Sequence, residues 1–436
     1  MLKNILKKIV VTILNWEARL IIKKYKPKIV GVTGSVGKTS TKEAVAAVLA
    51  TKFIVRKSEK SYNSEFGVPL TVIGCKTAWN SLFGWIENIY RGLLLIVFKE
   101  DYPEWLVLEV GADRPGDIKT IARKIKFDVA IVSRLPDVPV HIEFFKSKEE
   151  VIEEKMSLPL SIGKNGLVIL NADDENIISR KEMVRAKVLL YGFGEDASVR
   201  ATNDHILYEN NINGVSVPVG LAFNVIRGNN NTLVQVPGAV GSHLVYPILA
   251  AIATGMELGV TMLQAVEALS LHETPPGRLH LVKGFNDSTI LDDTYNSSPI
   301  AVEAALKTLG QIETIGKKIA VLGDMMELGS HTAVAHKKIG ELAAEIVDVL
   351  ITVGVRSKFT FETARGKGLD SSKVIHFDSS REVGEFLKNI IAPGDLILVK
   401  GSQSMRMERA VVAIMLAPEN RKKLLVRQDE EWERKV

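Results

Sequence analysis

The chain has 436 residues, which is too long for one ordinary hydrophobic core, so two or three domains are expected. Its 46% hydrophobic and 25% charged residues are typical of a soluble globular protein and exclude a disordered chain. The one cysteine excludes an internal disulfide and a four-cysteine zinc site and is typical of a reducing cytoplasm. The net charge of +5 is modest, and the first 28 residues exceed it with seven lysines and one arginine against one glutamate. The rest of the chain is nearly neutral, so nucleic-acid binding is not indicated.

Residues 1–28 are predicted to form a basic amphipathic helix, because apolar residues recur at helical spacing with lysines between them. Two interpretations stay open: the helix lies on an anionic membrane surface, or it docks on the protein's own body. Asn15 and Glu17 interrupt the apolar run and no small-residue cleavage site follows, which argues against a signal peptide and a membrane span.

Residues 79–98 form a second apolar segment with Glu87, Asn88 and Arg91 near its middle. These polar residues argue against a transmembrane helix and favour a buried or partner-facing helix. If both segments are exposed on one side, the protein is a cytoplasmic protein with peripheral membrane contact through residues 1–28.

Residues 31–40 read GVTGSVGKTS and stand between an apolar strand at 29–30 and a helical pattern at 42–49. Glycines between a strand and a helix let backbone N–H groups surround phosphate oxygens, Lys38 reaches the terminal phosphates, and the Thr39 hydroxyl binds Mg²⁺. A strict Walker sequence requires glycine at position 32, where this chain has Val32. The pattern predicts ATP and Mg²⁺ as cofactors, held by the following loop residues: Gly34, Ser35, Val36, Gly37, Lys38, Thr39 and Ser40.

The rest of the chain predicts an α/β fold: a P-loop central domain with a parallel sheet, followed by a C-terminal Rossmann-like domain. Asn- and Gly-rich turns between residues 196 and 240 indicate antiparallel hairpins, and residues 274–277, Thr-Pro-Pro-Gly, indicate a linker. The predicted limits are 1–28 for the N-terminal helix, 29–273 for the central domain and 274–436 for the C-terminal domain.

Three residues are candidates for metal chemistry. Glu109 ends an apolar strand, and in a P-loop domain the carboxyl end of a neighbouring strand faces the phosphates, although an acid there also caps turns. By position alone, His141 is more typical of a surface loop than of a metal ligand, and Lys155 is typical of a solvated helix face.

A set of motifs in a fixed order resembles the Mur ligases. The segments are TGSVGKTS at 33–40, NSEFGVP at 63–69, LEVGA at 108–112, PGDI at 115–118, HIE at 141–143, NADDE at 171–175, PGR at 276–278, DDTYN at 292–296, LGDMMELG at 322–329 and VKGSQSMRMER at 399–409. The last two favour the branch of the family that adds D-alanyl-D-alanine to a peptidoglycan precursor. The resemblance therefore implies an ATP-dependent amide ligase that works through an acyl phosphate.

The resemblance also implies roles for individual residues. Thr39 and Glu109 would hold one Mg²⁺, and His141 with a carbamylated Lys155 would serve a second. Arg278 would reach the phosphates across the domain gap, and Asp293 with Asn296 would bind the nucleotide. The substrate side would be lined by Asn63, Asp324 and Lys400. We expect a monomer.

Departures from the family pattern leave alternatives open. The family normally carries an N-terminal domain for the UDP-sugar, whereas here the P-loop begins after some 30 residues. Leu244 and Pro247 stand where asparagine is usual, so adenine contacts there are in question. The two alternatives are a related ligase that acts on another carboxylate, possibly membrane-held, and a nucleotide-binding scaffold without catalysis.

Overall fold

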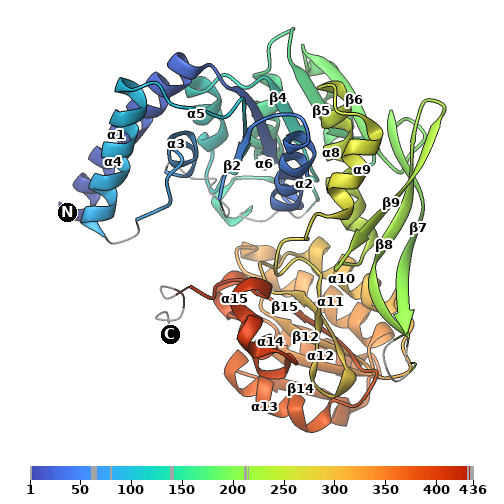
Figure 1. Ribbon diagram of the computed structural model, residues 1–436. Coiled ribbons are helices and arrows are strands. Elements are labelled where there is room, and N and C mark those ends of the chain that lie inside the picture. The colour runs from blue at the N-terminus through green and yellow to red at the C-terminus, as the bar shows by residue number, and fades with distance from the viewer. Residues whose placement is uncertain are drawn as a thin grey trace.

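The structure is a computed structural model that describes residues 2–59, 66–78, 81–137, 142–210, 214, 216–429 and 432. Within these residues the strands form two sheets, one of nine strands and one of six, each with helices on both faces (Figure 1). The α/β class predicted from the sequence is confirmed. The sheets lie on either side of residue 274, whereas the domain limits themselves stay a prediction.

The first sheet has the order β2-β3-β1-β4-β5-β6-β7-β8-β9. Strands β2 to β7 pair in parallel, and β7 to β9 pair in antiparallel fashion, as the turns between 196 and 240 predict. The hairpins extend the central sheet because β7 continues the ladder of β6. The bounds are β1 (Lys28–Thr33), β2 (Val55–Lys57), β3 (Trp105–Glu109), β4 (Val129–Val132), β5 (Leu167–Asn171), β6 (Lys187–Gly192), β7 (Val199–Asn210), β8 (Ser216–Arg227) and β9 (Asn230–Pro237).

Helices cover the parallel strands on both faces because alternate strand residues point to opposite sides. Val30 and Val32 of β1 pack on one side with α2 (Lys38–Ala50), α8 (Val245–Glu257) and α9 (Met262–Ser270). Ile29 belongs to the core on the other side. That side is covered by α1 (Leu2–Tyr25), α3 (Gly67–Ile73), α4 (Leu82–Val97), α5 (Asp117–Lys124), α6 (Lys148–Leu160) and α7 (Glu175–Ile178).

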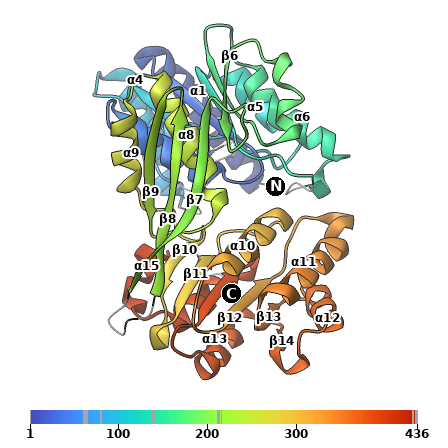
Figure 2. The ribbon, with the colours of Figure 1, turned by 90° about the vertical axis from the view of Figure 1, so that its right-hand side faces the viewer.

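The second sheet has the order β10-β11-β15-β12-β13-β14, with β10 as an antiparallel edge strand (Figure 2). Its strands are β10 (His280–Lys283), β11 (Thr289–Asp293), β12 (Lys318–Gly323), β13 (Val349–Val353), β14 (Val374–Phe377) and β15 (Leu396–Lys400). Its helices are α10 (Pro299–Gln311), α11 (Thr332–Ile346), α12 (Lys358–Gly366), α13 (Ser380–Ile390), α14 (Glu408–Ile414) and α15 (Arg421–Leu424).

The long strands β7 to β9 reach from the first sheet to the second domain (Figure 2). Ile206 and Tyr208 of β7 pack against the core of the C-terminal domain. The Tyr208 hydroxyl accepts a hydrogen bond of 3.0 Å from the Glu313 backbone N–H. The hairpins thus fasten the two sheets to each other at the side opposite α1.

The N-terminal helix α1 packs on the protein's own body, which confirms one of the two interpretations of this helix. Leu14, Ala18 and Ile21 are buried in the core that also holds Leu95 of α4. The Lys24 ammonium donates hydrogen bonds of 2.8 and 2.5 Å to the carbonyls of Leu95 and Phe98 at the end of α4. Of the helices that the structure describes, none is long and apolar enough to cross a membrane.

Glu17 of α1 is a buried acid at the contact with α4. A Cβ added at Gly92 would lie 2.3 Å from Glu17 Oε2, so a side chain at 92 would displace the Glu17 carboxyl from this position. Among the described residues neither carboxyl oxygen of Glu17 has a hydrogen-bond partner, and burial raises the pKa of Glu17 to about 7.

We predict that Glu17→Gln stabilises the protein at pH 8. The folded state binds the Glu17 proton more tightly than the unfolded state. The contribution of Glu17 to the free energy of unfolding is therefore greatest below the unfolded pKa of 4.5 and is lost as pH rises to about 7. Urea unfolding should show a gain of up to about 3 kcal/mol at pH 8 that disappears near pH 4. The exposed Glu87→Gln in α4 is the control and should show no such pH dependence.

Candidate active site

The site is built where β3, β1 and β4 end side by side, since the carboxyl ends of parallel strands meet at one edge of the sheet. Residues 34–37 form a loop between β1 and α2. Gly34 and Gly37 have φ angles of 134° and 87°, and a Cβ at Gly34 would lie 2.0 Å from the Ser133 Oγ. Glycine is required at 34 because both its backbone conformation and its contact with β4 exclude a side chain.

Lys38 opens α2 and folds back over the loop. Its Nζ donates hydrogen bonds to the carbonyls of Gly34 at 3.0 Å and Ser35 at 3.4 Å. Burial lowers the pKa of Lys38, and the nearby Glu109 carboxylate acts in the opposite direction. The Ser35 hydroxyl is buried without a hydrogen-bond partner among the described residues. A cationic loop with an unsatisfied hydroxyl fits a phosphate group.

Thr39 and Glu109 supply neighbouring oxygens from two elements. The Thr39 Oγ1 donates a hydrogen bond of 3.0 Å to Glu109 Oε2, and both residues are buried. The Glu109 backbone N–H donates to the Ser58 Oγ, which fixes the end of β3. Hydroxyl and carboxylate oxygens beside a phosphate cradle fit Mg²⁺, which usually takes one or two protein ligands. In the described part of the chain no three His, Cys, Asp or Glu residues gather as a metal site, so phosphate and water oxygens would complete the shell.

Lys155 of α6 is fully buried and faces the same charges. Burial, and after it the charge of Lys38, lower its pKa to about 7, while Asp113 acts in the opposite direction. The neighbouring Glu154 accepts hydrogen bonds from the N–H groups of Gly116 and Ile118 at the start of α5. The solvated helix face expected from position alone is therefore wrong for Lys155, which is buried near Lys38 and Asp113. The predicted residues His141 and Asn63 lie outside the described residues.

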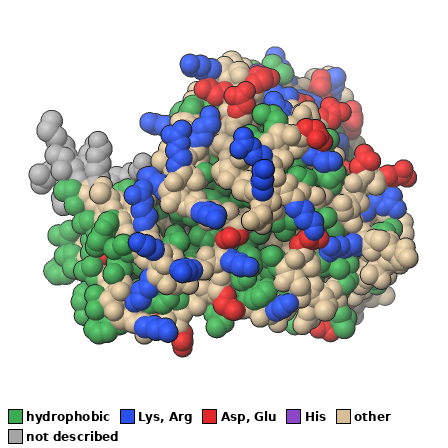
Figure 3. All heavy atoms as spheres, turned by 90° about the horizontal axis from the view of Figure 1, so that it is seen from above, with side chains coloured by type: hydrophobic (Ala, Val, Ile, Leu, Met, Phe, Trp, Pro, Cys, Tyr) green, Lys and Arg blue, Asp and Glu red, His purple; other side chains and the backbone are tan. Residues whose placement is uncertain are grey.

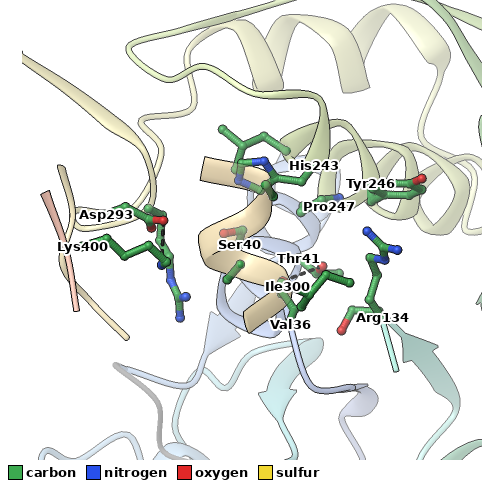
Figure 4. Close-up of a pocket in the computed structure, with 16 residues that line it drawn as sticks. Val36, Ser40, Thr41, Arg134, His243, Tyr246, Pro247, Asp293, Ile300 and Lys400 are labelled. Atoms are coloured by element: carbon green, nitrogen blue, oxygen red, sulfur yellow. Dashed lines mark hydrogen bonds and ion pairs between the residues drawn. The ribbon is translucent and has the colours of Figure 1, made fainter. Parts of the chain in front are cut away.

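A pocket lies between the two domains, next to the phosphate loop (Figure 4). The first domain contributes the loop and α2, the segment after β4, and the start of α8. The second domain contributes Arg278, Asp293, Lys400 and one face of α10. The full lining is Val36, Gly37, Ser40, Thr41, Ser133, Arg134, His243, Leu244, Tyr246, Pro247, Arg278, Asp293, Ile300, Ala301, Ala304 and Lys400.

Asp293 and Lys400 form the buried charge pair of the C-terminal wall. They are register partners on β11 and β15, and the Lys400 Nζ lies 2.7 Å from Asp293 Oδ2. The same ammonium donates to the Asn296 carbonyl at 2.8 Å. The structure thus joins Lys400 to the two residues predicted to bind the nucleotide. Asp324, predicted to lie on the amine side with Lys400, accepts a hydrogen bond from the Ser357 N–H at 2.7 Å at the end of β12.

Arg278 lines the pocket from the segment between the domains. Its guanidinium lies 4.1 Å from the centre of the Tyr295 ring, which holds it by a cation–π contact. Its Nε is buried and has no hydrogen-bond partner among the described residues. The side chain is therefore held in place with a donor unsatisfied, which suits an anionic ligand.

The comparisons with known proteins agree with this geometry. A family model described as "Mur ligase middle domain" matches residues 32–255, and one described as "Mur ligase, glutamate ligase domain" matches residues 277–403. The chain belongs to the Mur ligase family.

Two curated relatives of this Mur ligase are named UDP-N-acetylmuramoyl-tripeptide–D-alanyl-D-alanine ligase. The protein from Bacillus subtilis is 29% identical over 93% of this chain and 80% of its own length, and the protein from Escherichia coli is 29% identical over 89% and 76%. A solved structure of a MurF ligase from Thermotoga maritima in complex with ADP is similar with a TM-score of 0.76 and 26% identity, covering 94% of this chain and 84% of that one.

Several pocket residues of this Mur ligase were not predicted from the sequence. The Arg134 guanidinium lies 5.5 Å from the centre of the Tyr246 ring, and together they form the wall opposite Asp293 and Lys400 (Figure 4). Burial lowers the pKa of His243 to about 4, so this imidazole is neutral at pH 7. The sequence could have indicated Arg134 as a candidate, because it comes just after β4 at the same edge of the sheet where Glu109 ends β3.

Proposed function

We propose that this Mur ligase joins D-alanyl-D-alanine to a UDP-N-acetylmuramoyl-tripeptide with ATP as the energy source, as the names of its relatives state for those proteins. The proposal is supported by the position of the Lys38 cation, which lies near Glu109 and near Lys155, next to an interdomain pocket lined by Arg278 and Asp293 of the other domain.

The chemistry follows from the charges. An oxygen of the substrate carboxylate attacks the γ-phosphorus of ATP, ADP leaves, and an acyl phosphate forms. The free amine of the dipeptide then attacks the acyl carbon, loses a proton and expels inorganic phosphate, which leaves an amide. The first step brings two anions together, so cations must neutralise their repulsion. Lys38 is placed for this role because its Nζ lies over the phosphate loop.

Metal ions would add to this neutralisation. Thr39 and Glu109 are our proposed ligands for one Mg²⁺, which supplies charge stabilisation at the phosphate oxygens. His141 and a carbamylated Lys155 are the proposed ligands for a second. An amine with its pKa lowered to about 7 is partly neutral at neutral pH, and the neutral nitrogen can bond to the carbon of CO₂ with loss of a proton.

The C-terminal domain would hold the nucleotide and exclude water. Asp293 and Asn296 are proposed nucleotide contacts, and Arg278 is proposed to reach the phosphates across the gap, because its donor is unsatisfied there. Water exclusion protects an acyl phosphate from hydrolysis. We propose that the enzyme works as a cytoplasmic monomer.

Phosphate release from ATP tests the proposal. UDP-linked tripeptide with D-alanyl-D-alanine should give phosphate and the amide product, and omission of either substrate should remove nearly all turnover. A lipid-linked tripeptide in place of the UDP-linked one identifies the carboxylate carrier. Turnover on the lipid-linked compound alone would refute the UDP substrate and retain the ligase. ATP hydrolysis at the same rate with and without the two substrates would refute the ligase activity. So would the absence of ATP hydrolysis with every substrate combination.

A further inference from the structure

Helix α4 and Trp16 of the neighbouring α1 expose large apolar side chains, and we call this surface the α1–α4 face. It is defined by Trp16 of α1 and by Leu82, Phe83, Ile86, Tyr90 and Val97 of α4. The Phe83 side chain is 85% exposed and the Val97 side chain 69%. Figure 3 shows hydrophobic side chains gathered at this end of the molecule.

Helix α4 is apolar on both of its sides. Its inward side packs Trp85, Ile89, Leu95 and Ile96 on the core, with Asn88 and Gly92 also buried. A second set of large apolar residues, at positions three to four apart, is exposed on the outward side. Exposed apolar patches of this kind mark sites of interaction with a partner or a membrane.

The charges around the α1–α4 face are predominantly basic. Arg19 and Lys23 continue the exposed stripe of α1 beyond Trp16, and Lys99 follows the end of α4. The sequence of α1 has a single acid, the buried Glu17, and that of α4 has a single acid, Glu87. Figure 3 shows lysine and arginine side chains along the border of the hydrophobic area.

We propose that the α1–α4 face docks this Mur ligase on an anionic lipid surface, with both helices in the plane of the interface. Aromatic and aliphatic side chains on one side of paired helices, bordered by lysine and arginine, match acyl chains below and anionic headgroups around them. The charge selects a lipid surface because Arg19 and Lys23 border the apolar stripe on α1 and Lys99 borders it at the end of α4, with Glu87 as the one exposed acid of these two helices among the described side chains. The proposal does not depend on the substrate of the ligase reaction.

Vesicle co-sedimentation of the full chain tests the docking. Vesicles of phosphatidylcholine with one third phosphatidylglycerol should bring the protein into the pellet, and vesicles of phosphatidylcholine alone should bind it roughly tenfold more weakly. Raising the salt from about 0.1 M to 0.5 M should weaken binding because exposed charges are screened. Phe83→Glu should lower binding to anionic vesicles about tenfold or more.

Leu271→Glu is the matched control, since Leu271 is 84% exposed and lies outside the α1–α4 face. This variant should bind vesicles as the unchanged chain does, and both variants should keep the same melting temperature and phosphate release without lipid. Failure to bind anionic vesicles would overturn the proposal. Equal vesicle binding by Phe83→Glu and the unchanged chain would also overturn it. A dimer in size-exclusion chromatography that Phe83→Glu dissociates would overturn it as well and would assign the face to a second copy of the chain.

Discussion

Replacing Lys38 by alanine is expected to lower ligase turnover by about a thousandfold, measured as phosphate release with both substrates present. The reason is electrostatic: Lys38 is the cation whose Nζ lies over the loop carbonyls of Gly34 and Ser35, where the phosphates would bind. Lys38 is half-buried. Loss of such a cation beside developing negative charge raises the activation free energy far more than loss of a surface charge, because water screens it less there. Binding of ADP, followed by fluorescence or calorimetry, should weaken by a much smaller factor.

The control for Lys38→Ala is Lys187→Ala. Lys187 is an exposed lysine that pairs with Glu257 at 2.5 Å at the start of β6, the end of the strand opposite the phosphate loop, so its loss should leave turnover unchanged. Circular dichroism should show both variants folded. If the Lys38 variant retains more than a tenth of the turnover, the role of Lys38 in phosphoryl transfer must be abandoned.

Most of the fold was accessible from the sequence because buried parallel strands are short apolar runs of few residue types. The strand expected at 29–30 lies within β1 (Lys28–Thr33), and the helical pattern at 42–49 lies within α2 (Lys38–Ala50). The phosphate loop was equally accessible, since its glycines and Lys38 are contiguous. Strand β10 was missed, because His280–Lys283 is four residues long and partly exposed, which leaves little hydrophobic signal.

The site as a whole was less accessible, because its walls come from distant segments. Lys155 illustrates the difference: the sequence around it, Glu153-Glu154-Lys155, has the composition of a solvated helix, yet Glu154 caps the start of α5 and Lys155 is buried beside Lys38. Family resemblance indicated this position and periodicity did not. In the same way the pairing of Lys400 with Asp293 depends on the register of β15 with β11, which no local pattern encodes.

For helix α4 the sequence predicted the helix itself but did not predict which of its sides faces the core. An apolar segment with a polar middle predicts a helix, and the structure has one at Leu82–Val97. Which of its apolar residues face the core depends on the packing of α4 against α1. In the structure Gly92 lies against Glu17 of α1, Trp85 and Leu95 pack on the same core, and Phe83 and Tyr90 stay exposed.

Replacing Lys155 by alanine is expected to lower turnover about a hundredfold, and added acetate or formate at millimolar concentration should restore part of it. The proposed carbamate gives the second Mg²⁺ an anionic oxygen, and a small carboxylate that enters the space left by the side chain can supply the same oxygen. A variant that loses activity by unfolding gains nothing from acetate, so rescue separates the metal role from a packing role.

The pH dependence of the unchanged enzyme gives a second readout for Lys155. Its pKa is lowered to about 7, so the fraction of neutral amine, which alone reacts with CO₂, rises as pH increases from 6 to 8. Enzyme freed of CO₂ should therefore regain activity when CO₂ is supplied at a fixed dissolved concentration, and faster at pH 8 than at pH 6. Acetate should not activate the Lys38→Ala variant, whose missing charge is positive. Full turnover by Lys155→Ala without any added acid would show that the buried amine packs α6 and takes no part in holding metal.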